Sequence, residues 1–230
     1  MNKYLDSLNL PGTRQSNGTL DMGDSAAIMF NLMAFNSIQD DESRWYWNHD
    51  YNVPVRHPDK TKWWGQPDRY SRDQLIPLLC WAALHNQKEH PVVKAVFQAH
   101  KKNWFLRAWN SKRNGEINVP EKVRDFTTLE IWGLWFRIYK PIGYQILLNI
   151  CDLETLFGSI SWKFRKDRVT RNHMLVNITQ RDISPTWISK LSYKLNNWED
   201  LVDRWDKHCQ AVGEYPTADL FKKELLTKGK

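Results

Sequence analysis

Carboxylates gather in two short segments, each of which leads into an apolar run. Residues 21–25 carry Asp21 and Asp24, and residues 71–74 carry Arg72, Asp73 and Gln74. Asp24 fits the N-cap of a helix, and Asp73 fits the first turn of another, where the helix dipole favours an anion. Carboxylates at such positions have lowered pKa values, so they suit a base, a sugar-hydroxyl acceptor or a cation ligand better than a general acid.

Arg72 is the residue of the second segment that local structure does not explain. Ser71 and Gln74 form a capping box, whereas a cation in the first helical turn opposes the dipole. We therefore expect Arg72 to pair with Asp21 or Asp24, which would bring the starts of the two helices together. Two hypotheses follow for this cluster: a structural clamp, or a site in direct contact with a ligand.

Residues 40–70 predict a long irregular loop that is rich in aromatic side chains. The segment contains three prolines and the adjacent pair Trp63 and Trp64. Such a pair can stack against a sugar ring or a base, and it can equally cover the helical core from outside. His57, in the same loop, fits a hydrogen-bonded structural residue better than a catalyst.

Basic residues give the chain a net charge of +7, with 33 Lys and Arg against 26 Asp and Glu. One basic stretch predicts a helix face with two interpretations, a solvated surface or a phosphate-binding patch. Its residues are Lys163, Arg165, Lys166, Arg168 and Arg171.

Several classes of protein are excluded by what the sequence lacks. Three widely spaced cysteines give neither a disulfide framework nor a zinc motif, and there is no glycine-rich phosphate loop. We therefore expect no metal and no cofactor. No apolar run approaches the roughly 18 residues of a membrane span, and the N-terminus has no signal core. These features predict a soluble, intracellular chain with no membrane partner.

Helical periodicity and capping signals predict an all-α fold. We expect about eight helices arranged as hairpins in a partial ring. They form one domain over residues 1–230, with an irregular segment at 1–20 and the aromatic loop at 40–70. Helix starts are predicted near Asp24, Ser71, Pro91, Thr127-Thr128, Asp152, Ser184-Pro185 and Thr217. The spacing of Trp132 with Trp135, Trp104 with Trp109 and Trp198 with Trp205 predicts core positions.

Three of these segments in order resemble uncharacterised helical proteins of bacteriophage and bacterial genomes. The matching motifs cover roughly residues 18–90 and are Asp21-x-Gly23-Asp24-Ser25-Ala26, Arg56-His57-Pro58 and Tyr70-Ser71-Arg72-Asp73-Gln74. More remotely, a Ser-Arg-x-Gln helix start beside tryptophans resembles the α/α-toroid glycosidases and lyases. The first resemblance implies an origin, with a location in the host cytoplasm or in a phage particle.

Two classes of function follow. The first is a phage-type accessory or virion-associated protein that binds a phage or host protein, nucleic acid or a second copy of itself through aromatic and basic surfaces. The second is a domain that binds or processes a glycan, with Asp21, Asp24 and Asp73 as polar contacts and the tryptophan pair as stacking walls. If that domain is an enzyme, it is similar to a glycoside hydrolase or a lyase. A concave pocket at the acidic cluster favours the second class, and mutual ion pairs favour the first.

Overall fold

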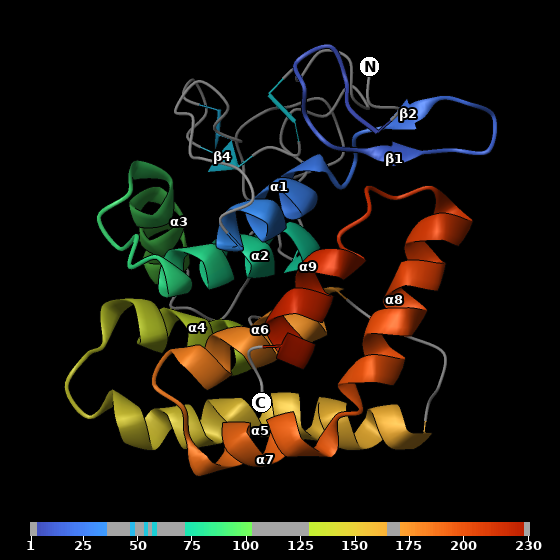
Figure 1. Cartoon of the computed structure of the whole chain (residues 1–230). Coiled ribbons are helices and arrows are strands. Elements are labelled where there is room, and N and C mark those ends of the chain that lie inside the picture. Colours follow the sequence, from blue (N-terminus) through green and yellow to red (C-terminus); the bar gives the residue numbers. More distant parts are fainter. Residues whose placement is uncertain are drawn as a thin grey trace.

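The computed structural model describes residues 4–35, 47–48, 53–54, 57–58, 72–102, 129–164 and 171–227. Most of these residues are helical (Figure 1). The helices are α1 (Ser25–Ala34), α2 (Arg72–Leu84), α3 (Pro91–Lys102), α4 (Leu129–Tyr139), α5 (Tyr144–Phe164), α6 (Arg171–Asp182), α7 (Trp187–Leu195), α8 (Trp198–Val212) and α9 (Ala218–Lys222), followed by a π-helical turn (Lys223–Thr227). Two short antiparallel pairs join β1 (Thr13–Arg14) to β2 (Leu20–Asp21) and β3 (Trp47–Asn48) to β4 (Val53–Pro54). The all-α prediction is confirmed.

The core is built around α1 and α2. Every residue of α1 is buried, which is expected of a helix that is apolar on all sides. Helix α2 packs against α1 on one side and against α4 and α6 on the other. In Figure 1, α2 accordingly lies between α1 above and the α4 and α6 layer below.

Three of the four described tryptophans at helical spacing are buried in this core, as their spacing predicts: Trp135, Trp198 and Trp205. The prediction is wrong for Trp132, which is half-buried and outside the core. Trp104 and Trp109 lie outside the described residues, so their prediction stays untested.

The predicted starts at Ser71 and Thr127-Thr128 lie just outside the described residues, directly before α2 at Arg72 and α4 at Leu129. Three other predicted helix starts are confirmed. Helix α1 begins directly after Asp24, α3 has Pro91 at its first position, and α9 follows Thr217. Proline suits the first helical position because its missing N–H would have no partner there.

Two predicted starts are wrong. Asp152 lies inside α5, which runs without interruption from Tyr144 to Phe164. Helix α7 begins at Trp187 rather than at Ser184-Pro185, because Thr186 is its N-cap. The Thr186 hydroxyl accepts from the backbone N–H of Ser189 at 3.0 Å, and the Ser189 hydroxyl accepts from the backbone N–H of Thr186 at 2.9 Å.

Helices α5 and α7 pack side by side at the base of the molecule in Figure 1. Helix α4 packs on α5 from above, and α8 leads away from this base toward α9. Within the described ranges, no helix combines the length and apolarity needed to cross a membrane. The hairpin ring and the single-domain outline stay predictions, and most of residues 40–70 lie outside the described ranges.

Candidate functional site

The starts of α1 and α2 meet, as the acidic cluster predicts. The buried Gln74 amide donates to Asp24 Oδ1 and to the carbonyl of Gly23, both at 3.3 Å. Asp24 occupies the N-cap position of α1, but its side chain makes no capping bond. The hydrogen bond between these two side chains therefore links two helices.

Asp21 is engaged locally. Its Oδ1 accepts from the backbone N–H of Gly23 at 2.8 Å, and its Oδ2 accepts from the Gln15 amide at 3.2 Å. The side chains of Arg72 and Asp73 and the whole of Trp63 and Trp64 lie outside the described residues. The clamp that we predicted around Arg72 thus stays a prediction.

His57 is buried and lies beside the half-buried carboxylate of Asp6. Its Nε2 lies 2.8 Å from Asp6 Oδ2, and the imidazole is only 3% exposed. The other oxygen of Asp6 accepts from the backbone N–H groups of Leu8 and Leu10. This pairing fixes the turn that precedes β1, which is the structural role that the sequence favours for His57.

Arg171 is not part of an exposed basic face, and its assignment to that face is corrected. Its side chain is buried, forms an ion pair with Glu214 at 2.5 Å, and lies over the ring of Trp205. The pKa of Glu214 is raised above its ordinary value, chiefly because the carboxyl is buried. The Arg171 guanidinium opposes this shift, and the nearby charge of Asp24 adds to it. Of the other predicted basic residues, Arg165, Lys166, Arg168 and the side chain of Lys163 lie outside the described residues.

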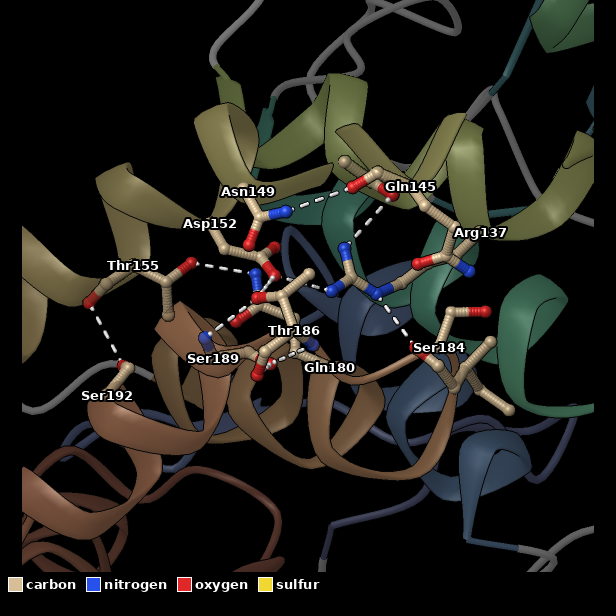
Figure 2. Close-up of polar contacts among 12 residues, drawn as sticks. Arg137, Gln145, Asn149, Asp152, Thr155, Gln180, Ser184, Thr186, Ser189 and Ser192 are labelled. Atoms are coloured by element: carbon tan, nitrogen blue, oxygen red, sulfur yellow. Dashed lines mark hydrogen bonds and ion pairs between the residues drawn. The ribbon is translucent and has the colours of Figure 1, made fainter. Parts of the chain in front are cut away.

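A buried polar cluster that the sequence reasoning missed joins α4, α5 and α7 (Figure 2). Arg137 donates from Nη2 to Asp152 Oδ2 at 2.8 Å, and both side chains have no exposed surface. The same guanidinium donates to the carbonyls of Ile183 and Gly133. Thr186, the cap of α7, donates its hydroxyl to the same oxygen of Asp152 at 2.7 Å.

The polar cluster continues along α5 toward α6 and α7. The Gln180 amide donates to the Thr155 hydroxyl at 2.9 Å, and the Ser159 and Ser192 hydroxyls lie 2.7 Å apart. Ser192 also donates to Asn177 Oδ1 at 3.0 Å. Hydroxyl and amide groups thus share the inward contacts of α5 with buried apolar side chains such as Leu148 and Leu156.

A small hollow opens where this cluster reaches the surface. It measures about 90 Å³ and is lined by Ser159, Leu195, Asn196, Asn197, Asp200, Leu201 and Arg204. None of these is a predicted site residue. Two of its lining residues, Asp200 and Arg204, lie one turn apart on α8 and form an ion pair at 2.6 Å. The volume suits about three water molecules.

The cysteines offer no reactive thiol. All three are buried and free. Burial raises the pKa of Cys151 and of Cys209 to about 12 and also raises that of Cys80, so the thiolate is disfavoured. In the part of the chain that the structure describes, no three His, Cys, Asp or Glu residues are grouped to hold a metal ion.

One exposed surface differs from all of these polar clusters. Eight large apolar side chains on α5, on the turn before it and on α7 face solvent. We call this set the α5–α7 apolar face: Ile142, Ile146, Leu147, Ile150, Phe157, Ile160, Trp187 and Leu191. Ile146 is 75% exposed, Phe157 64% and Trp187 67%. The sequence signal that could have found it is the helical spacing of Ile146, Ile150, Phe157 and Ile160.

The two kinds of surface differ in what they can do. The polar clusters hold their groups in hydrogen bonds within the chain, which stabilises the packing of helices. The side chains of the α5–α7 apolar face are exposed to solvent, whereas those of the core pack against other helices. An exposed apolar patch is typical of a surface that binds protein. Comparison with protein-family models, with curated proteins and with solved structures finds no match for this chain.

Proposed function

We propose that this chain acts by binding a protein partner through its α5–α7 apolar face. The accessory or virion-associated role implied by the resemblance to phage proteins belongs to the same proposal, since such proteins work through contacts with other subunits. The observation that carries the proposal is where the exposed apolar side chains lie. Eight of the eleven large hydrophobic side chains exposed in the described ranges lie on the packed helices α5 and α7 and on the turn before α5.

The orientation of α5 supports this proposal. Its inward contacts include Asp152, Thr155 and Ser159, all buried and hydrogen-bonded. Its outward side carries Ile146, Ile150 and Phe157, although exposing such side chains to water is unfavourable by about 25 cal/mol per Å². A second surface that covers them would recover this free energy.

Site-specific photo-crosslinking in cells tests the proposal. Replacing Phe157 by benzoylphenylalanine keeps an aromatic side chain on the apolar face, and the same replacement at Leu8, which is 47% exposed and outside the face, is the control. We expect discrete protein adducts from position 157 and none from position 8. Adducts that are identical from both positions, or no adduct from position 157, would refute the proposal.

A further inference from the structure

We infer that the partner of the α5–α7 apolar face is a second copy of this chain, bound through antiparallel pairing of the two α5 helices. The twofold axis passes near Leu153. This inference rests on the proposed function, because it names the occupant of the same face.

The spacing of the apolar residues on α5 is that of a helix that packs against another helix. Ile146, Ile150, Leu153, Phe157 and Ile160 follow one another at steps of four, three, four and three residues. This average of 3.5 residues keeps one seam in contact with a partner helix over its whole length. Four of the five side chains are exposed and Leu153 is half-buried, so the seam faces outward.

The same seam is complementary to itself. In a dimer with twofold symmetry, both subunits use the same surface. If a residue of one subunit contacts a second residue of the partner, the second residue of the first subunit makes the same contact with the partner. With the axis at Leu153, Ile146 lies opposite Ile160 of the second copy. Ile150 likewise lies opposite Phe157 of the second copy. None of the five positions is charged, so no like charges are buried against each other.

The exposed area approaches that of a dimer interface. A whole aliphatic side chain has about 60–120 Å² of apolar surface, which corresponds to 1.5–3 kcal/mol at 25 cal/mol per Å², and an aromatic one has about 150–250 Å². With the exposed fractions of its eight side chains, the α5–α7 apolar face therefore offers roughly 400–750 Å². A standard interface uses about 800 Å² from each partner.

The charges beside the seam carry both signs. On α5 the half-buried Glu154 borders the apolar residues, and its carboxylate accepts from the backbone N–H of Glu130 at 2.8 Å. Helix α7 contributes the exposed Lys190 and Lys194, and an anionic bilayer attracts such basic side chains. Vesicle binding is therefore included in the test.

The first experiment measures the mass of the purified full chain by sedimentation equilibrium. We expect twice the chain mass for the parent and the single chain mass for Ile150→Lys, which places a charge in the seam. Val212→Lys is the matched control, since Val212 is exposed at the end of α8, outside the face. It should remain a dimer, and circular dichroism should show that both variants are as helical as the parent.

The second experiment tests the antiparallel register by disulfide formation. Leu153→Cys should cross-link with itself on mild oxidation, because a residue beside a twofold axis meets its own copy. Ile146→Cys and Ile160→Cys should cross-link when mixed and not when oxidised separately. Self-linking of Ile146→Cys alone would indicate parallel helices and overturn the inference. The parent, with its three buried cysteines, gives the background.

Failure of this inference can be told from failure of the proposed function. A monomeric parent would overturn the inference that the partner is a second copy. If this monomer binds phosphatidylserine vesicles and Ile150→Lys abolishes the binding, the face binds lipid instead. If a monomeric parent still gives discrete adducts with a different protein from position 157 in cells, the proposed function stands with another partner. If it gives none, both fail.

Discussion

Arg137 and Asp152 form an ion pair that is fully buried. Their side chains meet at 2.8 Å with no exposed surface on either, although they lie on different helices. The three guanidinium nitrogens donate to Asp152, Gly133 and Ile183. The pair therefore fixes α4, α5 and the turn that leads into α7, which is the frame that carries the apolar face.

Removing one partner of this pair should be strongly destabilising. We expect Arg137→Met to lower the free energy of unfolding by about 3–5 kcal/mol, because it leaves the Asp152 carboxylate buried without its cation. Urea unfolding monitored by circular dichroism measures the loss. The double variant Arg137→Met with Asp152→Leu should be more stable than the single one, since no charge is then left buried. A single variant within about 1 kcal/mol of the parent would contradict this account of the pair.

Two glycines with similar backbone angles should respond differently to alanine. Gly213 and Gly143 have φ values of 72° and 76°. A Cβ on Gly213 would collide with the carbonyl oxygen of Arg14, whereas nothing lies within 4 Å of a Cβ on Gly143. Gly143→Ala should cost about 1–2 kcal/mol for the left-handed conformation alone. Gly213→Ala should cost clearly more, because the contact between β1 and the end of α8 must open. Equal midpoints in urea would show that this contact does not stabilise the fold.

Buried histidines should make the fold sensitive to acid. Burial lowers the pKa of His100 and of His173 to about 4, below the ordinary value of 6.5. The unfolded chain therefore binds protons first, and stability is complete above pH 6.5 and falls as the pH drops toward 4. Each group contributes up to about 3 kcal/mol. Unfolding free energies measured between pH 7 and pH 4 test this direction.

His100→Phe should reduce that pH dependence without loss of stability at pH 7. Among the described residues, neither ring nitrogen of His100 has a hydrogen-bond partner, and the ring packs edge-on against Trp135. Phenylalanine keeps the aromatic contact and buries no polar atom. A variant whose stability falls between pH 7 and pH 4 as steeply as that of the parent would show that His100 does not titrate in this way.

Local signals predicted much of the fold, and long-range pairing explains most of the errors. Asp24, Pro91 and Thr217 mark helix starts because capping depends on residues close in sequence. The sequence predicts a helix start at Asp152, because a carboxylate beside an apolar run fits a cap. Its actual partner, Arg137, lies on another helix, and the sequence does not show which residues pack together.

The same limit applies to the candidate site. Asp24 and Gln74 do meet, as helix starts with apolar faces predict. The basic neighbours of Arg171 in the sequence predict a basic surface, whereas its partner Glu214 comes 43 residues later. The apolar spacing on α5 was visible in the sequence, but periodicity does not show whether a stripe faces the core of its own chain or another molecule.

Carbene footprinting of the side chains on α5 tests the central claim most directly, because it reports which side chains water reaches. In the purified chain at high dilution, we expect Ile146, Ile150 and Phe157 to label strongly, and Leu8 to label as an exposed control. In concentrated solution or in cell extract, labelling of the three should fall while that of Leu8 is unchanged. Weak labelling of the three at high dilution, or equal labelling under all conditions, would contradict the claim that this face is exposed in the free chain and covered by a protein partner.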